Sequence, residues 1–357
     1  MPSNWTAFQA LCRIIGGLDS TALQLAIDAR LMPQVISLAT ASDVLPALAI
    51  RCYEQPDLAS TLTDRDTLYL REALLENTQR NMRIVTQSIK LIQTLNAAGI
   101  KPLLLKGTAQ LLTLNRERPG FRKQADIDLI VPPASLQAAG EALQADGYDF
   151  YRRNRPFEVH PGLAADTPAA ISASAAHHHL PPLVKRDQVA FVEVHRHFLP
   201  RRFQNQNPLE PFFESASEQQ INGATFLMPS TENQIIHIVL GKLLHDGYLT
   251  GRKLPLREAC DYIDLVAASR GTFDSSVVMA HCKEAFCIFD QLVTELMGHQ
   301  STRPTHASSN VRRRIGLMRL RYNSATAAKL LDTYTRVRHL GYSMRYSPSK
   351  LARYLRR

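Results

Sequence analysis

The stretch ADIDLIV (125–131) decides the fold of this chain, because it places two acids inside an apolar strand. Side chains at positions i and i+2 of a strand point to the same face, so Asp126 and Asp128 lie side by side. Two carboxylates this close repel each other unless a cation neutralises them, and a divalent cation bridged to phosphate does so well. The other interpretation of this stretch alone is one acid that caps the next helix beside a solvated neighbour.

A second apolar run, IKPLLLKG (100–107), precedes this strand and predicts another one. It is followed by Thr108 and by AQLLTLN (109–115), which is compatible with a helix. A glycine-containing turn that opens a helix presents backbone N–H groups and the positive end of the helix dipole to phosphate. The turn Lys106-Gly107-Thr108 is therefore a candidate phosphate site.

A third strand is predicted by VAFVEVHRHF (189–198), in which Glu193 and His195 share a face. If this strand lies beside the strand with the Asp pair, three carboxylates gather at one place. A third acid is what a two-metal phosphoryl or nucleotidyl transfer site requires.

The rest of the chain is mostly helical in pattern. Helices are predicted at 71–99, 135–147, 230–247 and 256–269, an Ala/Pro/Ser-rich loop at 154–176 and a linker at 299–310. We expect a helical N-terminal region (1–98), an α/β core (99–205), a helical C-terminal domain (206–300) and a tail (301–357). The fold class expected is α+β, a small mixed sheet flanked by helical regions.

Composition excludes several classes of protein. The 357 residues are 45% hydrophobic and 21% charged, which is enough to bury a core. No apolar run approaches the roughly 20 residues of a membrane span. The first residues lack a secretory leader, and the five cysteines are scattered without a CxxC, so a cytoplasmic chain with reduced thiols is expected.

The net charge of +10 belongs to the tail. Residues 301–357 hold fourteen Lys and Arg against one acid, Asp332, a net +13 that leaves −3 for residues 1–300. Arginines interleaved with tyrosines suit an RNA backbone with stacked bases, and tRNA or another polyanion is a possible partner. They equally suit an anionic membrane surface, and the third alternative is a tail packed on the body.

The pattern of these motifs resembles the nucleotidyltransferase superfamily that includes DNA polymerase beta. It is most similar to a bacterial branch described only as nucleotidyltransferase family proteins. The similarity covers roughly residues 70–270, and the motifs that carry it are LLLKG (103–107), PGFR (119–122), DIDLIV (126–131), ADGY (145–148), HHLP (178–181) and VEVHRHF (192–198).

The resemblance implies a metal-dependent transferase that moves a nucleoside monophosphate from an NTP to an acceptor hydroxyl and releases pyrophosphate. The implied catalytic and metal-binding acids are Asp126, Asp128 and Glu193, with Mg²⁺ or Mn²⁺ as cofactor and ATP as the expected substrate. The implied nucleotide-binding residues are Lys106, Gly107, Thr108 and Arg122. The acceptor is tRNA, a protein or a small molecule, and related folds act as toxins.

Further polar residues are candidates for the cleft. They are His179, His195, His237, His245, Asp246 and Arg252. No HExxH or Cys/His spacing indicates a structural zinc. The alternative function is a non-catalytic module that binds nucleotide or a partner through the same fold.

Overall fold

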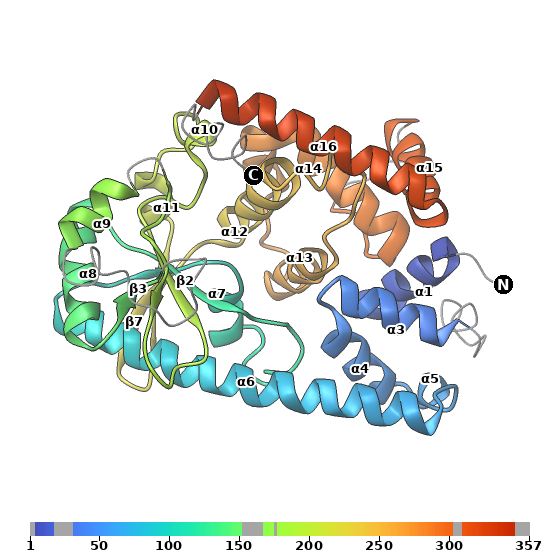
Figure 1. The fold of residues 1–357 in the computed structure, drawn as a ribbon, viewed down its shortest axis with the longest axis horizontal. Helices are drawn as coiled ribbons and strands as arrows, with labels where there is room; N and C mark the ends of the chain where they lie inside the picture. Colours follow the sequence, from blue (N-terminus) through green and yellow to red (C-terminus); the bar gives the residue numbers. More distant parts are fainter. Residues whose placement is uncertain (1–3, 18–30, 152–166, 175–176, 303–308, 347–357) are drawn as a thin grey trace. The chain divides into compact units, whose positions relative to one another are not determined.

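The chain divides into two units, each described here by itself (Figure 1). The computed structural model describes residues 4–17, 31–151, 167–174, 177–302 and 309–346. The sheet unit consists of Thr78–Pro119 and Gln124–His237. The helical unit consists of Met1–Asn77, Gly120–Lys123 and Ile238–Arg357.

A mixed sheet forms the centre of the sheet unit. Within the described residues it has seven strands in the order β3-β4-β5-β2-β1-β7-β6. The strands are β1 Leu103–Leu104, β2 Asp126–Ile130, β3 Asp149–Phe150, β4 Leu183–Val184, β5 Phe191–His195, β6 Ser217–Ile221 and β7 Ala224–Met228. The pairs β2/β5 and β1/β7 are parallel, and the other neighbours are antiparallel.

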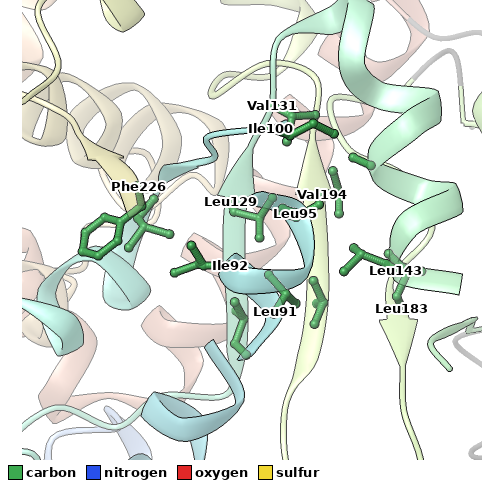
Figure 2. Packing of buried hydrophobic residues seen from close by; sticks show 14 of the residues in the cluster. Leu91, Ile92, Leu95, Ile100, Leu129, Val131, Leu143, Leu183, Val194 and Phe226 are labelled. Carbon is green, nitrogen blue, oxygen red and sulfur yellow. The ribbon is translucent and has the colours of Figure 1, made fainter. Parts of the chain in front are cut away.

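One face of this sheet is covered by helices. Leu91, Ile92 and Leu95 of α6 (Asp64–Ala97) pack with Leu129 of β2 and Val194 of β5 (Figure 2). Each of these side chains is at most 1% exposed. Burial of one such side chain contributes about 1.5–3 kcal/mol, so the alternation of the two strands fixes which side chains face the helices.

The remaining helices follow the chain. In the sheet unit they are α7 Lys106–Leu112, the 3₁₀ turn η1 Pro133–Ser135, α8 Leu136–Ala145, α9 Thr167–Ala173, α10 Arg201–Gln204, α11 Glu210–Glu214 and α12 Thr231–His237. In the helical unit they are α1 Asn4–Gly16, α3 Met32–Ala41, α4 Leu45–Glu54, α5 Pro56–Ala59, the π-helix η2 Ile238–His245, α13 Leu256–Ala268, α14 Ser275–Met297, α15 Ser309–Asn323 and α16 Ala325–Tyr346. Residues 64–77 of α6 also belong to this unit. Among the described helices none has the length and apolar character to cross a membrane.

The α+β class expected from the sequence is confirmed. The expected strand at 100–107 is shorter than predicted, because the chain turns into α7 already at Lys106, whose φ is +50°. The expected helix at 230–247 is present, but its second half is π-helical.

The hairpin β6–β7 was not expected, since residues 206–300 were interpreted as helical. Asn222 and Gly223 connect the two strands with φ values of +49° and +76°. Two consecutive positive φ values are typical of a type I′ turn, for which Asn-Gly is the preferred sequence. The sheet therefore extends beyond residue 205, the boundary at which the α/β core was expected to end.

The start of the basic tail packs against the helical unit. Val311 and Met318 of α15 are at most 1% exposed, and the ring of Tyr322 stacks on Phe8 with centroids 4.1 Å apart. The backbone N–H of Trp5 donates to a side chain at the end of α15. Of the three alternatives given for the tail, α15 therefore fits the one in which the tail packs on the body. Residues 303–308 and 347–357 of the tail lie outside the described residues.

We predict that Tyr322→Ala lowers the free energy of unfolding by about 2 kcal/mol, because it removes a largely buried ring from the contact with Phe8. Tyr334 of α16 is the matched control, since it is 51% exposed and its replacement by Ala should cost less than about 0.5 kcal/mol. Urea denaturation followed by circular dichroism measures both. Equal, small effects would show that α15 does not contribute to the stability of the body.

Candidate active site

Three side chains from two parallel strands converge on one face of the sheet. Asp128 of β2 lies opposite Glu193 of β5 in the strand register, and His195 follows two residues later on the same face. One ligand atom from each of the three lies within 4.8 Å of the others. The His195 Nε2 donates to Asp128 Oδ1 at 2.9 Å and lies 3.6 Å from Glu193 Oε2.

Lys106 supplies the cation of this cluster. Its Nζ donates to Asp128 Oδ1 at 2.5 Å, and its side chain is 38% exposed whereas that of Asp128 is 1% exposed. The φ of Lys106 is +50°, in the left-handed region where a residue with a Cβ is strained. Such a conformation persists only where contacts with the surrounding structure stabilise it.

The same turn also fixes the backbone of Asp128. The N–H of Leu105 donates to the Asp128 carbonyl at 3.1 Å, and the Asp128 N–H donates to Thr108 Oγ1 at 2.9 Å. Thr108 is 1% exposed. The threonine expected to hold phosphate therefore has its hydroxyl against β2, so its observed contact is structural.

The charges of the cluster are mutually stabilised. Burial alone would raise the pKa of Asp128, but the charge of Lys106 and the hydrogen bond from His195 outweigh it and hold this pKa well below its usual range. Burial would lower the pKa of His195, yet the carboxylates of Asp128 and Glu193 raise it. The cluster thus favours ionised carboxylates and raises the affinity of the His195 imidazole for a proton.

Lys106 faces more than one acid. Burial would lower its pKa, but the carboxylates of Asp128, Glu193 and Asp126 raise it, in that order of strength. Asp126 is half-buried at the start of β2 and shares the face of Asp128. The three acids predicted from the sequence therefore all act on the charge of Lys106, and Asp128 is the one that it contacts.

Two more of the expected histidines belong to this neighbourhood. The ring of His179 lies 5.3 Å from that of His195, and its backbone bridges to His195. Burial, followed by the charge of His195, lowers the pKa of His179. Burial, followed by the charges of Lys106 and His195, lowers the pKa of His237 to about 3. Both imidazoles are neutral near pH 7.

Other predicted site residues have different surroundings. Arg122 is 6% exposed in the helical unit, and its Nε donates to both carboxylate oxygens of Asp261 at 2.9 and 3.0 Å. A buried arginine engaged in this way is a structural ion pair, which differs from the phosphate contact expected. The last three predicted residues, His245, Asp246 and Arg252, also lie in the helical unit. His245 ends η2, Asp246 pairs with Lys242 at 2.8 Å, and Arg252 donates to a backbone carbonyl.

Two polar residues of α6 that the sequence analysis missed brace the strands. The Gln87 side chain donates to the Ala190 carbonyl at 2.9 Å and accepts from its N–H at 3.1 Å. The Arg80 guanidinium donates to the carbonyls of Gln124 and Val189, which precede β2 and β5. Arg80 and Gln87 are seven residues apart and so lie on one face of the amphipathic helix, and this spacing could have indicated from the sequence that both contact the sheet.

The donor set fits a divalent cation. Carboxylate oxygens are the preferred ligands of Mg²⁺ and Mn²⁺, and an imidazole nitrogen is also accepted by Mn²⁺. The cluster of Asp128, Glu193 and His195 is compatible with such an ion.

A family model described as uncharacterised nucleotidyltransferase matches residues 28–288, well over half of the chain. The chain belongs to this nucleotidyltransferase family. The match includes the acids on β2 and β5 and the turn at Lys106, and it confirms the resemblance drawn from the sequence. No curated protein and no solved structure matches the chain.

We predict that Thr108→Val lowers the free energy of unfolding by about 1–2 kcal/mol, because it leaves the buried N–H of Asp128 without its acceptor. Thr108→Ser is the matched control and should retain most of the stability, since its hydroxyl can still accept. Chemical denaturation in EDTA measures both variants. If Val is tolerated as well as Ser, Thr108 does not hold β2.

We predict that the nucleotidyltransferase loses stability from pH 7 to pH 5 more steeply than its His237→Gln variant. A histidine with a pKa of about 3 in the folded state takes up a proton near pH 6.5 only when the chain unfolds. The unfolded state then binds more protons, so the free energy of unfolding falls as the pH falls below about 6.5. Denaturation at both pH values in EDTA tests this, and identical pH dependences would contradict it.

Proposed function

We propose that this nucleotidyltransferase moves a nucleoside monophosphate from an NTP, with ATP as the expected donor, to an acceptor hydroxyl. The observation that carries the proposal is the cluster of Asp128, Glu193 and His195, with the Lys106 ammonium bound to Asp128. Asp126 lies on the same face of β2 as Asp128 and adds a third carboxylate there. A purely structural cluster has no need of three clustered acids, because each adds repulsion that the fold must offset.

Asp126, Asp128 and Glu193 are the residues that would hold Mg²⁺ or Mn²⁺. When bound, such ions supply charge neutralisation for the triphosphate and for the attacking oxygen. His195 donates to Asp128 Oδ1 and thereby fixes the orientation of the carboxylate, which is the role of a hydrogen bond behind a metal ligand.

The first turn of α7 is the proposed phosphate site. Gly107 and Thr108 are the second and third residues of α7, and the first N–H groups of a helix have no intrahelical acceptor. Lys106 precedes them, with a side chain exposed enough to reach a ligand. We assign Lys106 and the backbone of Gly107 and Thr108 to the triphosphate, and leave Arg122 out of this set because of its ion pair with Asp261.

In the proposed reaction the acceptor oxygen attacks the α-phosphorus and forms a new P–O bond. The bond from the α-phosphorus to the bridging oxygen breaks, and pyrophosphate leaves with that electron pair. The acceptor proton passes to the Glu193 carboxylate, which is half-buried at the rim of the cluster. Positioning and charge neutralisation supply most of the catalysis in such a transfer.

We predict that Asp126→Asn, Asp128→Asn and Glu193→Gln each lower the transfer of α-³²P label from ATP by more than about 100-fold. The acceptors are supplied as a cell extract, which is then separated into RNA, protein and small molecules. Glu218→Gln is the matched control: this acid of β6 lies in the same unit, is 54% exposed on its side chain and pairs with Lys101. Its transfer should equal that of the wild type.

Thermal melting separates catalysis from binding alone. ATP with Mg²⁺ should raise the melting temperature of the wild type more than ATP with EDTA, and Asp128→Asn should remove the difference. ATP stabilisation that is equal with and without metal, together with no label transfer, would support a non-catalytic nucleotide-binding module instead.

A further inference from the structure

Two guanidinium groups of the helical unit share one acceptor. Arg252, in the loop after η2, donates from Nη1 to the Leu249 carbonyl at 3.2 Å, and Arg314 of α15 donates to the same oxygen at 3.1 Å. Two permanently charged groups are thus held within a few ångströms of each other. Arg252 also has a φ of +55°, a strained conformation for a residue other than glycine.

Two more arginines are exposed on the same helices: Arg313 adjoins Arg314 in α15, and Arg338 follows Tyr334 by one turn of α16. Burial lowers the pKa of Arg252, and the positive charges of Arg313 and Arg338 lower it further. Burial likewise lowers the pKa of Arg314, with Arg252 as the next cause, against an opposing contribution from Glu284. We call Arg252, Arg313, Arg314 and Arg338 the arginine cluster.

The neighbouring cations Arg321 and Lys253 are arranged differently. Arg321 of α15 makes a bidentate contact with Asp332 at 2.9 and 3.0 Å, and Lys253 pairs with the same carboxylate at 3.0 Å. The single acid of the tail therefore balances these two residues. Arg252 and Arg314 are instead held by a backbone carbonyl, that of Leu249, which carries no net charge.

Tyr334 lies on the part of α16 that packs against the loop of Arg252, since a Cβ at Gly251 would lie 3.3 Å from Oγ1 of the next residue, Thr335. Tyr334 is 51% exposed, and its phenol is among the groups that act electrostatically on Arg252. An exposed aromatic ring next to fixed guanidinium groups is the combination that binds single-stranded nucleic acid, where the ring stacks on a base and the arginines contact phosphates.

We propose that the arginine cluster and Tyr334 bind a single-stranded polynucleotide, and that this strand carries the acceptor hydroxyl. The statement that this strand carries the acceptor hydroxyl rests on the proposed function, whereas the binding itself does not. Within residues 325–338 of α16, whose exposure is described, the exposed large apolar side chains are Leu330, Tyr334 and Val337. Membrane-surface helices bury a broad face rich in Trp, Phe and Leu, so the composition of this surface favours a polynucleotide over a lipid surface.

The test measures binding of fluorescein-labelled oligouridine and oligothymidine of about 12 nucleotides to the full-length protein in EDTA, by fluorescence anisotropy. Arg313→Gln and Arg338→Gln, both at exposed positions, should each raise Kd about three- to tenfold. Each should reduce the slope of log affinity against log salt by about 0.7, the value for one phosphate contact on a single strand. Tyr334→Ala should weaken binding about tenfold through lost stacking.

Arg319→Gln is the matched control, because it removes the same charge from an exposed position of α15 outside the cluster. Its Kd should stay within about twofold of the wild type. A loss equal to that of Arg313→Gln would overturn the proposal, since binding would then follow net charge alone. Binding of phosphatidylserine vesicles without binding of either oligonucleotide would overturn it in favour of a membrane surface.

The Asp128→Asn variant keeps this test separate from catalysis. It should bind the oligonucleotides as tightly as the wild type, because it leaves the helical unit unchanged. Cluster-dependent binding without any label transfer would refute the proposed function and leave the cluster as a polynucleotide site. Label transfer to a protein or small molecule, with no oligonucleotide binding, would refute only the inference drawn from the arginine cluster.

Discussion

The burial of one carboxylate, that of Asp128, governs the structure around it. A charged group that is 1% exposed is costly unless partners replace its water shell. Here the Lys106 ammonium and the His195 imidazole both bind its Oδ1. The strained turn at Lys106, the hydroxyl of Thr108 and the parallel pairing of β2 with β5 all serve to bring these partners to that atom.

The sequence predicted that Asp128 and Glu193 would share a face because strand alternation is a local property. Alternation within 125–131 and 189–198 places acids on one face and apolar residues on the other, and the structure pairs Asp128 with Glu193 across adjacent strands. The α+β class followed from the order of helical and alternating segments. What periodicity could not supply was the ion pair of Lys106 with Asp128, since it depends on a side chain crossing from the turn to the strand.

Other features were missed for distinct physical reasons. The Asn222-Gly223 turn was a strong hairpin signal, but it lies between short segments, one of them the exposed edge strand β6. Arg122 looked like a phosphate ligand because it precedes the acid pair by only four residues. Its partner Asp261 is 139 residues away in sequence, and no local pattern reports a contact at that separation.

The contact between Lys106 and Asp128 Oδ1 has a thermodynamic consequence. A divalent cation at this oxygen would compete with the ammonium group, so metal binding would release a positive charge beside the turn where phosphate is expected. A released Lys106 attracts an anionic nucleotide more strongly than one that is already paired. By linkage the nucleotide of the proposed reaction would then tighten the metal by the same factor, so the two ligands would bind cooperatively even though each touches a different part of the site.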